Sequence, residues 1–250
     1  MPRDMTSATF IGWLLRHTKL RGLRLSSARY PVSSDIHGEI MFALSWWHFR
    51  QSDDPNLSHA SALWVHGLGG SAREVYVNHE QRDKPPNDSS LTQDAIDRAF
   101  KNQPRHTRLI YQMAGTRITI LNGKYTNRLA VQEANIPTGD PVEVTSLERT
   151  LIDVTVRPNY AGGVLEVIEA FAAAHGRVSI TKLARVLKTL DYTYPYHQAI
   201  GFYLKRSGFS SNDQRLFARK GIHLDFYLCH GLRDPIWDPE WRIFYPRALG

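Results

Sequence analysis

Two histidines have a spacing that could hold a metal ion. His59 and His66 are seven residues apart, and this spacing places two side chains on one face of a helix. Zinc in proteins is held by three or four side chains, so a metal site here needs at least a third ligand. The sequence shows no such ligand nearby. We therefore expect no metal site.

Two carboxylates near one expected helix start could act as a general acid and base. Glu148 and Asp153 flank Arg149. The run from Thr145 to Glu148 matches the S/T-x-x-E capping box, which gives Glu148 a role at the helix start. Asp153 is expected to pair with Arg149 or with Arg157. These structural roles outweigh a catalytic one, so no catalytic residue is predicted.

Known enzyme signatures do not fit the chain. It contains no GxxxxGK, no strand-linked GxGxxG and no GxSxG. Nucleotidyl transfer would need a Gly-Ser turn followed by paired carboxylates on a strand. Asp83 follows Gly70-Ser71, but Lys84-Pro85-Pro86 comes next and cannot form that strand. A two-carboxylate nuclease centre would need Glu-x-Lys, and residues 143–145 (EVT) lack the lysine. We therefore predict that the chain is not an enzyme and holds no cofactor.

Basic residues are concentrated at the start of the chain. Residues 1–30 hold six basic residues against one acidic residue, a net charge of +5, whereas the other 220 residues hold 25 basic and 23 acidic residues. This distribution is typical of contact with nucleic acid or with an acidic protein face. A solvated basic end is the alternative, but apolar residues at 10, 11, 14 and 15 favour a folded segment. The predicted DNA contacts are Arg16, Lys19, Arg21, Arg24 and Arg29.

A second group of aromatic and basic residues lies near the C-terminus. The aromatic residues could stack on bases, but we favour a role in the core for them: Tyr192, Tyr194, Tyr196, Phe202, Tyr203 and Phe209. The basic residues could form a second basic face: Lys205, Arg206, Arg215, Arg219 and Lys220. The helices expected at 179–190 and 195–207 have a helix-turn-helix outline, which leaves a second DNA contact open.

The elements expected around the N-terminal basic residues match part of a winged helix. A helix capped by Thr6 or Ser7 should run to about residue 18. Two short strands, at 23–25 and 30–32, should be joined by residues 26–28. A further helix at 38–49 should precede a polar break at 52–56. Because only residues 1–5 precede the first helix, we predict a partial winged helix over residues 1–50.

The rest of the chain changes from mixed elements to helices. Up to residue 136 the patterns predict a helix at 60–66 capped by Ser58, a strand at 74–78, a helix opening at Leu91 or Thr92, a hairpin of 109–111 with 117–121, and a strand at 129–132. Beyond residue 136, helices are predicted at 145–156, 163–175, 179–190 and 195–208. Strands at 224–228 and 241–245 end the chain.

Composition places the chain among globular proteins. Of its 250 residues, 42% are hydrophobic and 22% charged. The apolar run at 10–15 is too short to span a bilayer, and it lacks a secretory cleavage site. The single cysteine, Cys229, cannot form an internal disulfide. We therefore predict a cytoplasmic α+β protein without membrane contact. It has a partial N-terminal winged helix (1–50), an α+β middle region (51–136) with a mixed antiparallel sheet, and a mainly helical C-terminal region that closes with two strands (137–250).

Three segments resemble the AbiEi-type antitoxins of type IV toxin–antitoxin systems. Residues 57–68 (LSHASALWVHGL) resemble the family's SHxSALxLHGL segment. Residues 144–153 (VTSLERTLID) resemble its T-ERTLID helix, which Arg157-Pro158 and Gly162-Gly163 continue. Residues 194–204 (YPYHQAIGFYL) look like a block of one branch of the family. The resemblance covers nearly the whole chain.

The resemblance implies a winged helix that binds and represses the operon's own promoter, and a C-terminal domain that counters a nucleotidyltransferase-like toxin in phage defence. Promoter DNA and the cognate toxin would be the partners. The second basic face, Lys205 to Lys220, is the predicted neutralising surface. The chain departs from the family in lacking the leading helix of a full winged helix. Two alternatives stay open: a stand-alone DNA-binding transcriptional regulator, and a nucleic-acid-processing enzyme that uses Glu148, Asp153 or the two histidines.

Overall fold

The computed structural model describes residues 23–25, 28–30, 55–71, 74–81, 90–113, 116–136 and 141–250. The helices predicted at 7–18 and 38–49 lie outside these ranges, as do Arg16, Lys19 and Arg21. Within the described ranges, no helix is long and apolar enough to cross a membrane.

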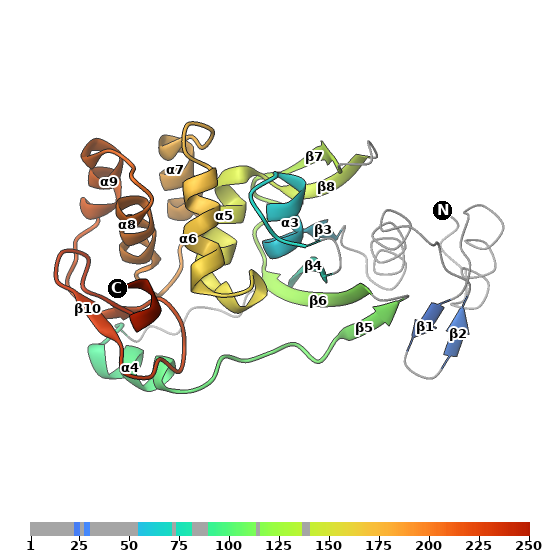
Figure 1. The fold of residues 1–250 in the computed structure, drawn as a ribbon, viewed down its shortest axis with the longest axis horizontal. Coiled ribbons are helices and arrows are strands. Elements are labelled where there is room, and N and C mark those ends of the chain that lie inside the picture. The colour runs from blue at the N-terminus through green and yellow to red at the C-terminus, as the bar shows by residue number, and fades with distance from the viewer. Residues whose placement is uncertain are drawn as a thin grey trace.

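A six-stranded mixed sheet forms the centre of the molecule, with the strand order β5-β6-β4-β3-β8-β7 (Figure 1). Its strands are β3 (Asn56–Leu57), β4 (Glu74–Gln81), β5 (Ile110–Met113), β6 (Thr116–Lys124), β7 (Val131–Asn135) and β8 (Pro141–Thr145). The pairs β4–β6 and β3–β8 are parallel, and the other three pairs are antiparallel. Because β8 pairs with both β3 and β7, the sheet draws strands from both sides of residue 136.

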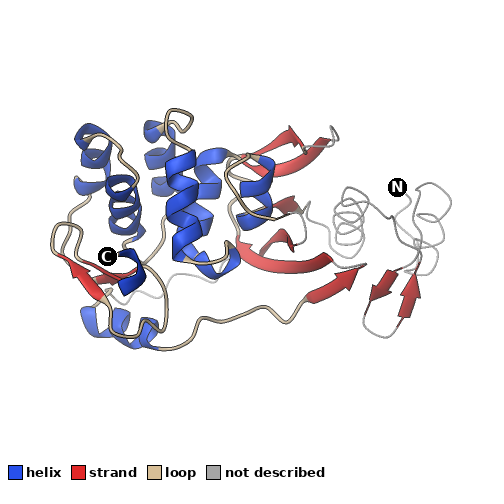
Figure 2. Ribbon diagram, viewed as in Figure 1, coloured by secondary structure: helices blue, strands red, loops and turns tan. Residues whose placement is uncertain are grey.

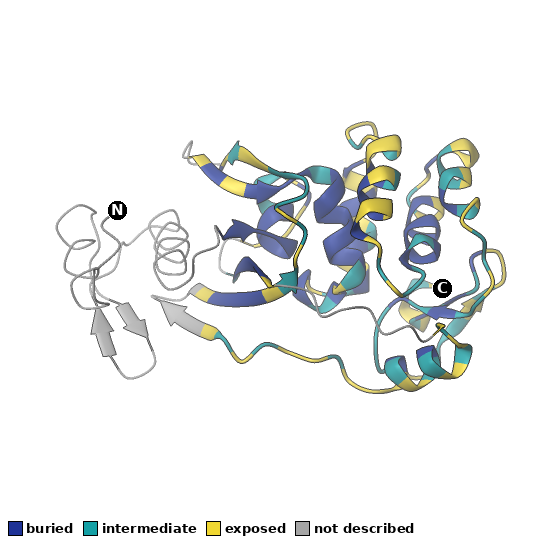
Figure 3. Ribbon diagram, turned by 180° about the vertical axis from the view of Figure 1, so that it is seen from behind, coloured by how far each residue is buried: buried dark blue, intermediate teal, exposed yellow. Residues whose placement is uncertain are grey.

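Helices cover the sheet and then stack on one another (Figure 2). The helices are α3 (His59–Val65), α4 (Gln93–Lys101), α5 (Leu147–Val156), α6 (Val164–Ala173), α7 (Ile180–Leu190), α8 (Tyr196–Arg206) and α9 (Ser211–Ala218). α3 packs on β4 and on α5, while α6, α7 and α8 all contact α5. Figure 3 shows buried residues concentrated where the sheet and these helices meet. The α+β prediction is therefore confirmed, and α5 is the central helix.

The start of α5 differs from the predicted capping box. Thr145 is still part of β8, paired with Val131, so the helix begins one residue later than expected. Ser146 is the N-cap, and its hydroxyl accepts a hydrogen bond from the Arg149 amide. Glu148 therefore does not close a box with Thr145. Its carboxylate instead accepts a hydrogen bond from the Ser179 amide, at the start of α7.

A second, three-stranded sheet lies near the C-terminus. It has the order β10-β11-β9 and consists of β9 (Phe226–Tyr227), β10 (Ile236–Asp238) and β11 (Ile243–Tyr245). Helix α4 docks on β9, where the Phe100 ring meets Phe226 at 4.9 Å between centroids. From α4 the chain runs under the helices to β5 at the edge of the main sheet (Figure 1). We call this segment, residues 102–109, the strap. Neither β10 nor α9 was predicted.

Two short strands near the N-terminus form an antiparallel hairpin. They are β1 (Leu23–Leu25) and β2 (Ala28–Tyr30), with Arg24 directly opposite Arg29. The second strand begins two residues earlier than predicted, because Leu25 pairs with Ala28 and leaves only residues 26–27 for the turn. The two predicted strands themselves are confirmed as an antiparallel pair. The rest of the predicted winged helix lies outside the described residues.

Candidate functional site

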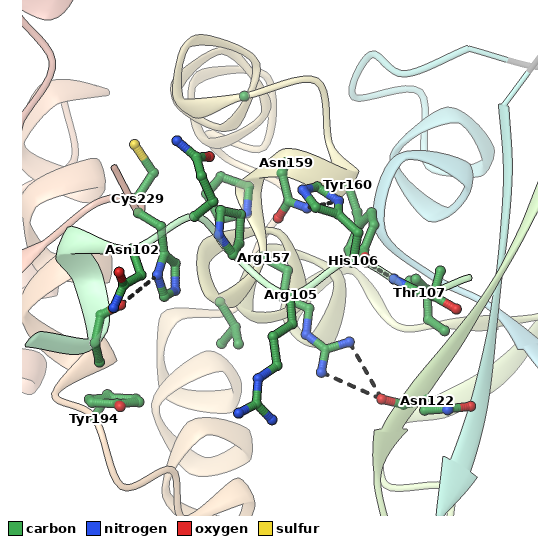
Figure 4. Close-up of a pocket in the computed structure, with 18 of the residues that line it drawn as sticks. Asn102, Arg105, His106, Thr107, Asn122, Arg157, Asn159, Tyr160, Tyr194 and Cys229 are labelled. Atoms are coloured by element: carbon green, nitrogen blue, oxygen red, sulfur yellow. Dashed lines mark hydrogen bonds between the residues drawn. The ribbon is translucent and has the colours of Figure 1, made fainter. Parts of the chain in front are cut away.

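A groove of about 1320 Å³ opens between the strap and the end of α5. Its walls come from the strap, the 3-10 helix at Pro158–Tyr160, the start of α6 and the loop before α8. His230 and Cys229, which follow β9, also line it, and Figure 4 shows Cys229 in the lining. Segments that are far apart in the sequence therefore meet at this groove.

The strap is extended and is held at its middle. Asn102 ends α4 in a backbone conformation that no longer continues the helix, and Pro104 follows. The Thr107 amide donates a hydrogen bond to the Tyr160 hydroxyl at 3.2 Å, and the Thr107 hydroxyl accepts one from the Leu109 amide at 3.1 Å. The bond to Tyr160 fixes the strap relative to the 3-10 helix after α5, and the bond from Leu109 shapes the strap itself.

The groove is lined by basic residues and contains no carboxylate among its lining residues. Its lining residues include three arginines and two histidines, and none of them is an aspartate or a glutamate: the basic ones are Arg105, His106, Arg108, Arg157 and His230. Arg105 and Arg108 are exposed and have no ion-pair partner among the described residues. The Arg157 guanidinium donates only to the Asn122 carbonyl, through two long contacts of 3.5 and 3.4 Å (Figure 4). Unpaired guanidinium groups of this kind favour an anionic ligand.

Aromatic rings in the groove are held by packing behind them. Tyr160 lies 5.6 Å from Tyr76 and 5.7 Å from His59, measured between ring centroids. His230 stacks on Phe100 at 4.3 Å and an interplanar angle of 14°. Tyr194 is half-buried and packs against Phe100 at 5.3 Å. The rings are therefore positioned before any ligand arrives.

The groove offers cations and hydrogen-bond donors rather than an activated nucleophile. Burial raises the pKa of the Cys229 thiol to about 11, so this group stays protonated at neutral pH. Below the groove, burial lowers the pKa of His59 well below its usual value, and the charges of Arg157 and Arg149 lower it further. His59 is therefore neutral at neutral pH. The arrangement can bind and orient an anion.

The two histidines considered as metal ligands have other contacts. His59 Nδ1 lies 2.9 Å from the Ser58 hydroxyl, and His66 Nε2 lies 2.7 Å from the Thr145 carbonyl oxygen. Burial lowers the pKa of both rings. Across the described ranges, no three His, Cys, Asp or Glu side chains come together as a possible metal site.

The two carboxylates considered for catalysis are part of the scaffold. Arg149 Nε donates to Asp153 Oδ1 at 2.8 Å, so Asp153 takes the first of its two predicted partners. Burial raises the pKa of Asp153, while the attraction of Arg149 opposes that rise. Glu148 pairs with Lys182 at 2.8 Å. Burial raises the pKa of Glu148, but Lys182 and the Ser179 amide lower it more, so the pKa falls on balance.

The structure divides the predicted second basic face into two groups. Lys205 pairs with Asp238 and Glu240, and Arg206 donates to the Leu249 carbonyl and lies over the Phe202 ring. The other three, which we call the α9 surface, have no carboxylate ion-pair partner among the described residues and lie on or just after α9: Arg215, Arg219 and Lys220. Arg24 and Arg29, two of the predicted DNA contacts, occupy opposed positions in the β1–β2 hairpin.

The groove is not apparent in the sequence. Arg105 and Arg108 lie in a stretch without helix or strand periodicity, and nothing in the sequence around Arg157 places it opposite them. The available signal was the strap itself, where basic residues and a histidine surround Pro104 (QPRHTR, residues 103–108). That pattern marks an exposed basic loop but does not show which surface it faces.

Comparison with known proteins supports the fold alone. No protein-family model and no curated protein matches the sequence. Among solved structures, the chain is similar to the RV2827C protein from Mycobacterium tuberculosis, with a TM-score of 0.56 and 15% sequence identity. The match covers 97% of this chain and 80% of the mycobacterial one. At this identity the likeness places the two chains in the same α+β architecture.

Proposed function

We propose that this chain is the antitoxin of a type IV toxin–antitoxin pair. In this proposal it neutralises a nucleotidyltransferase-like toxin, represses its own promoter, and acts in both cases by binding. The main support for the proposal is that the three segments that resemble AbiEi-type antitoxins lie together in the fold.

These three segments pack against one another. They contain α3, the β8–α5 junction and α8, and both α3 and α8 contact α5. Leu63, Leu151 and Ile200, one from each segment, are almost fully buried in the same core. A resemblance spread over distant parts of the sequence thus falls on one packed unit. This consistency supports a shared scaffold over chance similarity of short strings.

The residues that an enzymatic reading would need are used in structural contacts. Asp153 is bonded to Arg149, and Glu148 holds the start of α7. His66 contacts the last residue of β8. These contacts favour a binding protein over the nucleic-acid-processing alternative that relied on the same side chains.

Two surfaces have separate roles in this proposal. The basic segment of residues 1–30 contacts promoter DNA through Arg16, Lys19, Arg21, Arg24 and Arg29. The α9 surface contacts the toxin, because its cations have no carboxylate partner among the described residues. Lys205 and Arg206, which were also predicted, are bound within the chain and have a structural role instead.

Growth rescue tests the proposal. The neighbouring reading frame is expressed alone and then together with this chain, and surviving cells are counted. Toxicity of the neighbour alone, with growth restored by this chain, supports the antitoxin. A toxic neighbour without rescue would refute the proposal, and a harmless neighbour would favour the stand-alone DNA-binding regulator.

A further inference from the structure

We propose that the groove between the strap and the end of α5 binds single-stranded nucleic acid. Arg105 and Arg157 contact the phosphates, and the rings of Tyr194 and His230 contact bases. This site is distinct from the N-terminal basic segment and from the α9 surface, so the inference goes beyond the proposed antitoxin function.

The charge of the groove points to a phosphate-bearing ligand. Two arginines outside the groove pair with carboxylates, Arg128 with Glu143 and Arg247 with Asp234. Arg105 and Arg157 have no such partner among the described residues, and no lining residue is acidic. Guanidinium groups bind phosphate in a geometry that a lone ammonium cannot match.

The size of the groove favours a strand over a single nucleotide. At about 1320 Å³ it exceeds the roughly 300–1,000 Å³ of common small-molecule pockets. Its cations come from different segments, with Arg105 on the strap and Arg157 at the end of α5 (Figure 4). Cations on two separate segments can contact several phosphates along one nucleic-acid backbone.

The rings and amides favour single-stranded over duplex nucleic acid. Bases must be unstacked to reach aromatic side chains, as they are in a single strand. One face of His230 is covered by Phe100, and Tyr194 lies nearby in the same lining. Four side-chain amides add hydrogen-bonding groups suited to base edges: Gln103 and Asn122, together with Asn102 and Asn159, whose amide nitrogens also contact the Arg98 carbonyl and the His106 ring. A duplex would present phosphates but leave these groups unused.

Fluorescence anisotropy with a labelled single-stranded oligonucleotide of mixed sequence tests the site. The experiment uses the full chain with Arg21→Glu and Arg24→Glu in every variant, so that the N-terminal segment contributes little. Adding Arg105→Glu and Arg157→Glu should weaken binding by about tenfold or more. It should also reduce the slope of log K against log salt by about 1.4, since each phosphate contact on a single strand contributes about 0.7.

Arg185→Glu is the matched control. Arg185 is an exposed, unpaired arginine of α7 that does not line the groove, so the same charge reversal there should leave affinity within about twofold. Ultraviolet cross-linking of the oligonucleotide gives a second readout on the unsubstituted chain. Cross-links should map to the peptides that contain Tyr194 and His230.

Four results would overturn the inference. The first three are absence of binding, equal binding by the groove variant and the control, and cross-links that avoid both peptides. Competition by ATP as strong as that by the oligonucleotide would also overturn it, because the site would then accept one nucleotide. Growth rescue is independent of all these outcomes, so the antitoxin proposal can stand or fail separately.

Discussion

At the scale of single residues, Arg149 links three parts of the fold. Its guanidinium reaches Asp153 on the same helix, the Leu129 carbonyl before β7 and the Thr126 hydroxyl after β6. Arg149 is only 4% exposed and Asp153 only 6%. A buried ion pair adds little net stability but is costly to break, because the remaining charge is left without a partner.

Arg149→Met should therefore lower the free energy of unfolding by about 3–5 kcal/mol. Arg149→Met with Asp153→Leu should recover much of that loss, because no buried charge remains. Urea denaturation of the two variants and the parent measures both effects. Equal destabilisation by the single and double variants would contradict the assigned role of the pair.

One buried and two half-buried histidines should make the fold sensitive to mild acid. Burial lowers the pKa values of His59, His66 and His197 below 6.5 in the folded chain. Below about pH 6.5 the unfolded chain binds more protons than the folded one, so stability falls as the pH falls. The urea midpoint should drop between about pH 7.5 and about pH 5.5.

His59→Asn should reduce that drop, and asparagine tolerates the positive φ of 51° at this position. An unchanged pH dependence in this variant would show that His59 does not contribute. Comparing the parent chain with this variant separates protonation of the buried His59 ring from protonation of surface groups.

At the scale of elements, α8 packs on the C-terminal sheet through a glycine. A Cβ added to Gly201 would lie 2.0 Å from the Trp241 ring, which is 2% exposed. Gly201→Ala should therefore destabilise the chain by about 1–3 kcal/mol, although alanine favours helices, because the ring cannot move out of the core. A thermal midpoint equal to that of the parent would show that α8 and Trp241 are not in this close contact.

Local signals predicted most helices but not the order of strands. Thr92, Ser179 and Pro195 do stand at helix starts, as expected from capping preferences. The cap of α5 was placed at Thr145 instead of Ser146, because the sequence does not show that β8 continues through Thr145. Strand order depends on contacts between distant segments, and the parallel pairing of β4 with β6 left no local pattern.

The candidate site was predictable only in part. Several of the aromatic residues predicted to lie in the core do lie in the core, with Phe202 and Tyr203 fully buried. The groove could not be predicted, because Arg105, Arg157 and His230 meet only once α4 has docked on β9 and the strap has returned to the sheet. A linear pattern carries no information on that path.

At the scale of the whole molecule, the proposal separates DNA binding from toxin binding. Arg21→Glu with Arg24→Glu should remove promoter binding, because both changes reverse charges in the segment that carries a net charge of +5. Gel-shift titration with the operon's own promoter duplex measures this effect. Equal affinity of variant and parent would reject these contacts, and binding by either should weaken steeply with added salt.

Growth rescue with two matched variants tests whether this chain neutralises the toxin and whether it does so through the α9 surface. Cells that express the neighbouring toxic gene receive the parent chain, the Arg21→Glu/Arg24→Glu variant or an Arg215→Glu/Arg219→Glu variant, and survivors are counted. We expect rescue by the first two and loss of rescue with the third, at equal protein levels. Failure of the parent to rescue would contradict the antitoxin assignment, and rescue by all three would contradict the role of the α9 surface.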